Sequence, residues 1–239
     1  DLEELAGLLE LPENPKAFAL LAHCFTCGKD LKGAARIARK LTENAIAVLR
    51  FDFTGLGNSE GDFSNTNFSS NISDLLCAVD YLRRQYEAPS LLIGHSLGGS
   101  AILSIAGEVP EAKAVVTIGS PGELTHVKRL FKDDVENINQ HGAYPVELAG
   151  RVFTLKKQML DNIQEHKIAH KVFAMNKPLL IFHATEDDTV LIEQAEKIFK
   201  AAKHPKSFIS LGKADHLLTH AQDAEYVADI IISWSECYL

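Results

Sequence analysis

The sequence lacks several features that would place it in a specialised class. No stretch of the 239-residue chain approaches the roughly 18 consecutive apolar residues that a membrane-spanning helix needs. It has no basic run and its formal net charge is −8, so a nucleic-acid-binding surface is not expected. The first ten residues lack the cationic start and apolar block of a secretory signal. We therefore expect a cytoplasmic globular protein with neither membrane nor nucleic-acid partners.

Cysteine is also scarce, with four residues, and two of them stand in Cys24-Phe25-Thr26-Cys27 just after an apolar run. A zinc site would need a second pair of ligands at suitable spacing, and the sequence has none, so no metal is expected. A redox dithiol is the alternative, because such pairs also occur where a strand gives way to a helix. We expect reduced thiols that pack as small apolar side chains.

What the sequence does contain is an alternation of short apolar runs and segments of helical periodicity. The predicted strands cover residues 5–11, 17–22, 45–51, 90–94, 114–118, 178–183 and 207–211, and the predicted helices cover 32–43, 70–86, 100–108, 190–202 and 221–236. This pattern predicts an α/β fold, a mostly parallel sheet covered by helices on both faces. We expect a single domain over residues 1–239, with 5–11 as a hairpin arm whose partner strand precedes the chain.

One long segment, residues 122–177, breaks the alternation. It is polar, helix-prone in pieces, and contains a hairpin-like stretch at 144–155. At roughly 50 residues it is longer than a simple crossover between two strands. A decorated helical crossover is one interpretation. A lid over the strand ends is the favoured one, because long insertions at that edge usually shape a pocket.

The segment from Leu91 to Gly99 carries the most informative motif. An apolar run of strand character enters Gly94-His95-Ser96-Leu97-Gly98 and leaves into a helix-compatible stretch. This layout predicts a nucleophile elbow, a turn so tight that Ser96 is held exposed at a helix N-terminus. Glycine at both ends of the motif leaves room where a Cβ would crowd the nearby strand or helix.

A serine hydroxyl is a poor nucleophile, so it needs a base within hydrogen-bond reach and an orienting acid behind that base. Among ten histidines, His216 follows the final predicted strand, at the edge of the sheet where reactive groups gather. We predict that His216 is the base. His220, one helical turn further along, is its rival.

Three adjacent carboxylates, Glu186, Asp187 and Asp188, follow the strand that precedes the last one. Acids are favoured at helix N-termini, and Asp188 suits the cap of a helix predicted to begin near Val190. Asp187 would then turn back toward His216 and hold its tautomer. Spacing favours Asp187 over Asp188 and leaves both open.

Acyl transfer also needs N–H donors for the tetrahedral oxyanion. One is the backbone N–H of Leu97, immediately after the nucleophile, and the second is that of Phe25, in the loop after an early strand. We further expect His95, Val190 and Leu217 to contact the substrate. This chemistry requires no cofactor.

Two glycine-rich loops could instead bind nucleotides. In residues 55–61 the third glycine is one position late for a dinucleotide fingerprint, and residues 94–99 lack the lysine of a phosphate-binding loop. A tight loop and an elbow are the favoured interpretations. Asp52, at the end of a predicted strand, is expected to brace the first loop.

Several of these segments together resemble the α/β-hydrolase superfamily. The elbow, residues 23–26 and residues 50–61 carry this likeness. Residues 66–71 and 201–208 are more specific, since they resemble the hydrolase half of bacterial α/β-hydrolase/OsmC fusion proteins, and the resemblance covers nearly the whole chain.

The resemblance implies an α/β-hydrolase fold, a serine esterase triad and a His-Gly-x-x-Asp-x-x-Val loop. That loop falls on residues 183–190 and selects Asp187, with Ala184 where many hydrolases have glycine. Such relatives often carry an OsmC-like thiol peroxidase domain downstream. Because the chain has no initiator methionine and ends at Leu239, either a stand-alone member or one part of a longer fusion is expected.

Three functional hypotheses follow. The first is a carboxylesterase-type serine hydrolase that cleaves small-molecule esters through an acyl-enzyme, with Ser96, His216 and Asp187 as its triad. The second is a non-catalytic or accessory acyl-binding module partnered with an OsmC-like thiol peroxidase. The third makes Cys24 and Cys27 a redox dithiol. The intact triad pattern favours the first.

Overall fold

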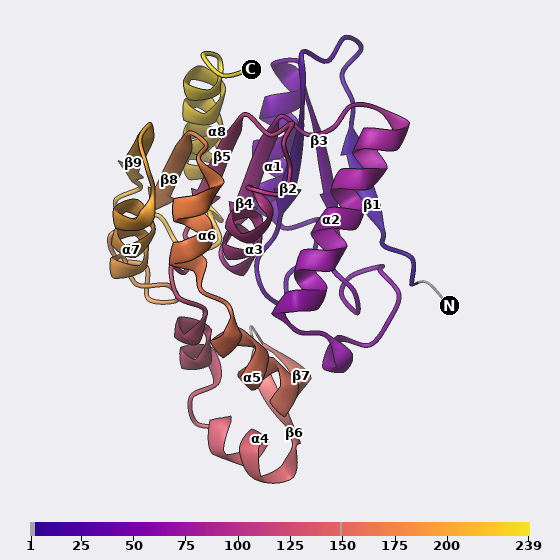
Figure 1. Ribbon diagram of the computed structural model, residues 1–239, viewed down its shortest axis with the longest axis vertical. Helices are drawn as coiled ribbons and strands as arrows, with labels where there is room; N and C mark the ends of the chain where they lie inside the picture. The colour runs from indigo at the N-terminus through magenta and orange to yellow at the C-terminus, as the bar shows by residue number, and fades with distance from the viewer. Residues whose placement is uncertain (1–2, 149) are drawn as a thin grey trace.

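The short apolar runs become the strands of one sheet. Within residues 3–148 and 150–239, which it describes, the computed structural model contains a seven-stranded sheet of order β1-β3-β2-β4-β5-β8-β9 (Figure 1). The strands are β1 Gly7–Glu10, β2 Ala17–Ala22, β3 Ile46–Phe51, β4 Leu91–His95, β5 Ala114–Ile118, β8 Leu179–His183 and β9 Lys206–Ser210. All pair in parallel except β1 with β3. The predicted α/β-hydrolase fold is confirmed.

Residues that alternate along each strand build two separate cores. In β2, Phe18 and Leu20 enter one core while Ala19 and Leu21 enter the other. One face of the sheet is covered by α1 (Lys32–Glu43) and α8 (Ala221–Ser235), and the other by α2 (Phe68–Gln85), α3 (Leu97–Ile105), α6 (Ile168–Met175) and α7 (Glu193–Ala201). None of the described helices has both the length and the apolar character that crossing a membrane requires.

The first strand corrects one prediction. β1 pairs antiparallel with β3, with Gly7 opposite Phe51 and Glu10 opposite Val48, so its partner lies later in the chain rather than before it. β3 is buried throughout, and β1 supplies hydrogen-bond partners for its outer edge. The residues of β1 are exposed or half-buried, as suits a strand at the edge of a sheet.

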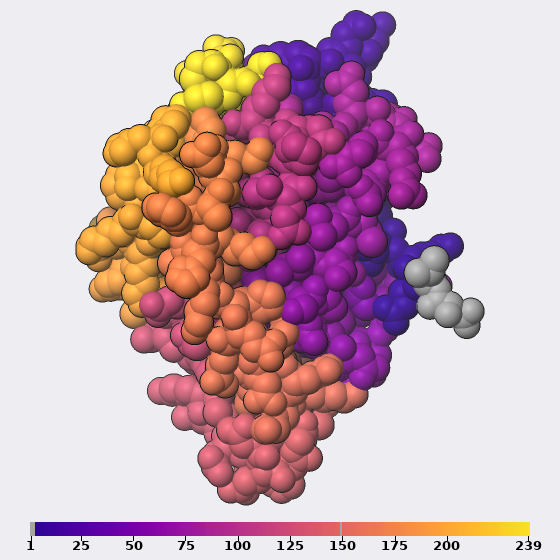
Figure 2. Space-filling view, viewed as in Figure 1, coloured from indigo at the N-terminus to yellow at the C-terminus, as the bar shows by residue number. Residues whose placement is uncertain are grey.

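The segment 122–177 forms a projection and one covering helix. The projection contains η2 (Leu124–Phe131), α4 (Val135–His141), β6 (Ala143–Leu148), β7 (Arg151–Lys156) and α5 (Lys157–Glu165), and it forms one end of the molecule (Figures 1 and 2). β6 and β7 pair antiparallel, which confirms the predicted hairpin, although its position 149, like residues 1–2, lies outside the described residues. α6 instead packs against α3 and α7, within the layer that covers the sheet.

Candidate active site

Ser96 stands alone between β4 and α3, in a strained turn. Its φ of 54° and ψ of −129° fall in a region that side-chain-bearing residues rarely adopt. A Cβ on Gly98 would lie 2.2 Å from the carbonyl oxygen of His23, and one on Gly94 would lie 2.4 Å from the Cα of Gly99. Both glycines are therefore required by contact with neighbouring backbone. The helix begins at Leu97, directly after the serine and earlier than the stretch at residue 100 where we expected it.

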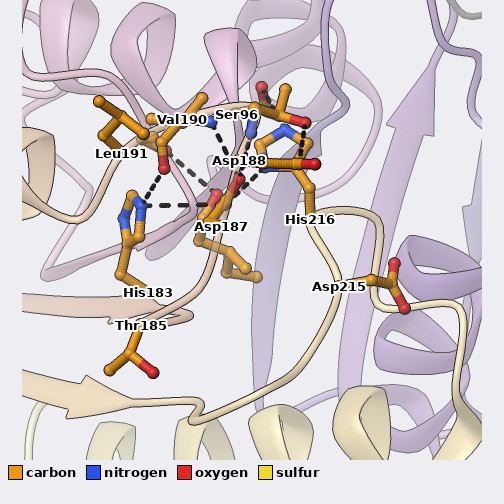
Figure 3. A network of polar contacts seen from close by, with 12 residues as sticks. Ser96, His183, Thr185, Asp187, Asp188, Val190, Leu191, Asp215 and His216 are labelled. Carbon is orange, nitrogen blue, oxygen red and sulfur yellow. Dashed lines mark hydrogen bonds and ion pairs between the residues drawn. The ribbon is translucent and has the colours of Figure 1, made fainter.

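A chain of hydrogen bonds runs from Ser96 through His216 to Asp187 (Figure 3). Ser96 Oγ lies 2.9 Å from Nε2 of His216, and Nδ1 of His216 lies 2.7 Å from Oδ2 of Asp187. With its proton on Nδ1, the imidazole donates to the carboxylate and accepts from the hydroxyl. The three residues come from loops that follow β4, β8 and β9. The rival His220 is exposed at the start of α8, away from this chain.

Asp187 is held by its own loop as well as by the imidazole. Its Oδ1 accepts the backbone N–H groups of Thr189 at 3.0 Å and Val190 at 2.9 Å, which leaves Oδ2 for His216. Asp188 is exposed and accepts from the Thr189 hydroxyl at 3.2 Å. α7 begins at Glu193 without a side-chain cap, so the expected capping role of Asp188 is wrong. The helix begins three residues later than the expected start near Val190, and the Val190 N–H is bonded to Asp187 instead.

The side chains at both ends of this series of hydrogen bonds are shielded from solvent. Ser96 is 7% exposed and Asp187 is 6% exposed. Burial alone raises the pKa of Asp187, but hydrogen bonds from His216 and from the Val190 N–H, with the charge of His216, outweigh it and hold the pKa below its ordinary value. Asp187 is thus an anion in position to stabilise an imidazolium formed when His216 takes the serine proton.

The loop after β2 lies against the elbow. Phe25 and Leu97 line the same small cavity, together with His23 and Gly98. In residues 3–148 and 150–239, neither the Phe25 N–H nor the Leu97 N–H donates to a protein acceptor. Two free backbone donors beside a buried serine suit an oxyanion, because such donors stabilise negative charge that develops in a water-excluded site.

A disulfide bond joins Cys24 and Cys27 across this loop, so the expectation of reduced thiols is wrong. Thr26, between them, has a φ of 61°, and this reversal brings the two Cα atoms to 5.4 Å, a normal distance for a disulfide. The remaining cysteines, Cys77 and Cys237, are free and exposed. The disulfide therefore closes the turn that presents the Phe25 N–H.

Asp52 braces two loops beside the site, which confirms its predicted role. Its carboxylate accepts the backbone N–H of Lys29 at 2.6 Å, the Lys29 ammonium at 2.8 Å and the backbone N–H of Asn58 at 3.0 Å. Burial raises the pKa of Asp52, but the Lys29 and Asn58 hydrogen bonds outweigh it and leave the pKa lowered. Asp52 thus ties the loop after β2 to the glycine-rich loop after β3.

The three residues expected to contact substrate lie in different settings. Val190 is 5% exposed in the acid loop, and Leu217 is half-buried beside His216. His95 is 4% exposed, and its Nε2 lies 2.7 Å from the carbonyl oxygen of His216. Sequence reasoning assigned no role to two other buried histidines, His23 and His183. The available signal was that each directly follows or ends an apolar strand.

The chain is similar to known proteins in both sequence and structure. A family model described as "Serine aminopeptidase, S33" (Hydrolase_4) matches residues 13–133, about half of the chain. The chain belongs to the Hydrolase_4 family. The crystal structure of the esterase domain of a Rhodothermus marinus protein is 41% identical, with a TM-score of 0.77, over 98% of this chain and 99% of that one. These matches place the chain in the α/β-hydrolase superfamily.

More distant similarities extend to a curated relative and to a solved structure. The human mitochondrial palmitoyl-protein thioesterase ABHD10 is 26% identical over 193 residues, which are 78% of this Hydrolase_4 chain and 56% of the relative. The chain spans about half the length of the curated relatives that it matches. Est1E from Butyrivibrio proteoclasticus, with ferulic acid bound, is 22% identical with a TM-score of 0.85 over 99% of this chain and 96% of that one, and it shows the same fold.

Proposed function

We propose that this Hydrolase_4 protein is a carboxylic-ester hydrolase that works through an acyl-enzyme on Ser96. The observation that carries the proposal is the unbroken series of hydrogen bonds from Ser96 to His216 to Asp187. A nucleophile, a base and an orienting acid in that arrangement are what acyl transfer needs. A module that only binds an acyl group would need none of the three.

The proposed reaction has two halves. Ser96 Oγ attacks the acyl carbon while Nε2 of His216 takes the hydroxyl proton, and Asp187 stabilises the resulting imidazolium. The N–H groups of Phe25 and Leu97 hold the oxyanion of the tetrahedral intermediate. His216 then gives its proton to the leaving alkoxide, and the alcohol departs. Water, deprotonated by His216, attacks the acyl-enzyme, and the acid is released as the serine regains its proton.

We propose that the insertion of residues 122–177 acts as a lid on this site, with its projection, from η2 to α5, over the acyl side. An aromatic series supports the idea, because Phe63 lies 5.6 Å from Phe25 and 4.9 Å from Phe153, between ring centres. Phe25 belongs to the loop beside the elbow and Phe153 to β7 of the projection, so the series connects them. A surface formed by these three phenylalanine rings suits an apolar or aromatic acyl group.

The single experiment that tests this function is hydrolysis of short p-nitrophenyl esters by the Ser96→Ala variant. We expect turnover to fall to the background rate while the melting temperature stays near that of the parent protein. Ser104→Ala is a matched control, since the Ser104 hydroxyl is buried in α3 and donates to the carbonyl of Ser100. Undiminished turnover in Ser96→Ala would overturn the proposal.

A thioester is a second candidate substrate class. The observation that favours it is the 26% identity with a protein named palmitoyl-protein thioesterase. The same serine, base and oxyanion donors would cleave either bond, so the choice depends on the leaving group and on the acyl pocket. Matched oxygen ester, thioester and anilide substrates with one acyl chain would rank the three classes by kcat/KM.

The likeness to hydrolase/OsmC fusion proteins and a cytoplasmic location stay predictions. A thiol peroxidase partner would matter to the redox alternative, in which Cys24 and Cys27 exchange with a peroxide-reducing domain. Dithiol-dependent peroxide reduction that survives Ser96→Ala but not Cys24→Ser would favour that alternative over ester hydrolysis.

A further inference from the structure

Three parallel strands of the sheet, β2, β4 and β8, each end at or just before a buried histidine. His23 directly follows β2, His95 ends β4 and His183 ends β8, with exposed fractions of 1%, 4% and 0%. The carboxyl ends of parallel strands meet at one edge of the sheet, which is where the site lies. None of the three is needed to move a proton in the proposed reaction, so their burial at this edge calls for another explanation.

Each histidine bonds the backbone of a loop that carries one part of the site. His23 Nδ1 lies 2.8 Å from the carbonyl oxygen of Cys24, in the loop with the oxyanion donor Phe25. His95 Nε2 lies 2.7 Å from the carbonyl oxygen of His216 itself. In the acid loop, His183 Nε2 lies 2.7 Å from the carbonyl oxygen of Val190.

The partners decide which ring nitrogen carries the proton. A carbonyl oxygen only accepts, so the bonded nitrogen must be an N–H. The second nitrogen of each ring, Nε2 of His23 and Nδ1 of His95 and His183, is buried without a hydrogen-bond partner in the described part of the chain. A proton added there would create a buried, unpaired charge. Burial accordingly lowers the pKa of His95 to about 3, and it lowers the pKa of His23 and His183 as well.

His95 has the most direct connection to the reacting atoms. It precedes Ser96 in the chain, and its ring holds the main chain of His216, so a single side chain ties the nucleophile to its base. The Ser96 Oγ to His216 Nε2 distance of 2.9 Å depends on the relative position of two loops that are 120 residues apart. His216 stands in the loop between β9 and α8 (Figure 3).

His183 supports the acid in a comparable way. His183 donates a hydrogen bond to the Val190 carbonyl oxygen, while the Val190 N–H donates to Asp187. The backbone of Val190 is therefore held through both its carbonyl and its N–H group. His183 Nε2 also lies 3.8 Å from Oδ2 of Asp187, beyond hydrogen-bond distance (Figure 3). The carboxylate therefore keeps its hydrogen bond to His216 while the histidine restrains the loop behind it.

We propose that His95, His183 and His23 are positioning residues, neutral imidazoles that hold the base loop, the acid loop and the oxyanion loop in register with Ser96. The proposal rests on the ester-hydrolase function above. It assigns His95 a contact with the base rather than with substrate. Each ring works through one N–H and one carbonyl, so an amide of matching reach can replace it, whereas an apolar side chain of similar volume cannot.

The test compares His95→Leu with His95→Gln, because a glutamine amide can place an N–H where Nε2 stands. Misplacing a catalytic group by about 1 Å can cost about 10²-fold in rate, so we expect His95→Leu to lower kcat about 100-fold with KM within about threefold of the parent value. His95→Gln should recover kcat to within about tenfold. A kcat unchanged in His95→Leu, or a change confined to KM, would overturn the positioning role.

The same pair of substitutions at His183 tests the acid loop, and at His23 the matching amide is asparagine, because the bonding nitrogen there is Nδ1. Should a leucine variant fail to fold, nitrogen NMR of the parent protein tests the proposal directly. The ring nitrogen shifts of His95 should report a neutral imidazole with its proton on Nε2 at pH 7. A neutral ring protonated on Nδ1, or an imidazolium, would overturn the proposal.

Failure of the ester-hydrolase proposal looks different from failure of the positioning role. A parent protein that neither hydrolyses esters nor reacts with an acylating probe at Ser96 lacks the function itself. A parent protein that does both, with His95→Leu matching its kcat, retains the function and contradicts the role of the histidine.

Discussion

The Asp187→Asn substitution tests whether Asp187 acts by fixing the tautomer of His216. The carboxylate offers two acceptor oxygens, of which Oδ1 takes two backbone N–H groups and Oδ2 takes the His216 N–H. Asparagine has one oxygen, which we expect to stay with the two backbone donors. Its NH2 then faces Nδ1 of His216 and selects the tautomer protonated on Nε2. That nitrogen points at Ser96 and can no longer accept its proton.

The expected loss follows from this change of tautomer. An acid-to-amide change that fixes the wrong tautomer costs about 10⁴-fold in kcat, or about 5.5 kcal/mol of transition-state stabilisation. The fold should lose only about 1–2 kcal/mol, because one charge-assisted hydrogen bond is weakened while the backbone contacts of the loop persist. The assay is kcat and KM for a short p-nitrophenyl ester, with urea denaturation of the same samples.

Asp188→Asn is the matched control, because its carboxylate is adjacent in sequence but exposed. We expect this variant to retain parental kcat/KM. An Asp187→Asn variant that keeps more than a tenth of the parental rate, or an equal loss of activity in both variants, would contradict the orienting role of Asp187.

Three further predictions concern stability. Gly98→Ala places a Cβ 2.2 Å from the His23 carbonyl oxygen, so we expect thermal denaturation to show a lower melting temperature and a free energy of unfolding reduced by about 3 kcal/mol. An unchanged melting temperature would show that the elbow can relax. Asp52→Ala removes a buried carboxylate that accepts from the Lys29 ammonium and from two backbone N–H groups, so it should lower the free energy of unfolding in urea by about 3 kcal/mol. A loss below about 1 kcal/mol would argue against the brace. The pKa of His95 falls on folding from 6.5 to about 3, mainly through burial, so the unfolded chain binds a proton that the folded protein does not. Stability should therefore fall as pH drops below about 6.5, by up to about 1.4 kcal/mol per pH unit from this residue, and His95→Gln should show a shallower slope in urea titrations at several pH values. Equal slopes would contradict the buried, neutral ring.

The fold could be predicted because its signal is local. The five central strands, β3, β2, β4, β5 and β8, are short and mainly apolar runs, and the segments between most of the strands have the spacing of an amphipathic helix. The partner of β1 could not be predicted in this way. Pairing with β3 depends on which edge of the sheet is left open, a property of the assembled sheet that no run of residues encodes.

The candidate site was only partly accessible to sequence reasoning. Ser96 and His216 stand out because each follows a strand in the expected order. Spacing could not decide between Asp187 and Asp188, since the two differ in which one turns inward, and that depends on the backbone donors of the acid loop. The disulfide between Cys24 and Cys27 depends on the reversal of the chain at Thr26. The hydrogen bond between His95, at the end of β4, and the loop of His216 joins residues distant in the sequence, so no local pattern predicts it.

Covalent capture of Ser96 tests the central claim most directly. The folded parent protein would be treated with a fluorophosphonate probe, digested, and the modified peptide located by mass spectrometry. We predict one adduct, on Ser96, that disappears in Ser96→Ala and forms much more slowly in His216→Gln. A folded protein that hydrolyses esters yet carries no adduct on Ser96, or carries its adduct on another residue, would contradict the account.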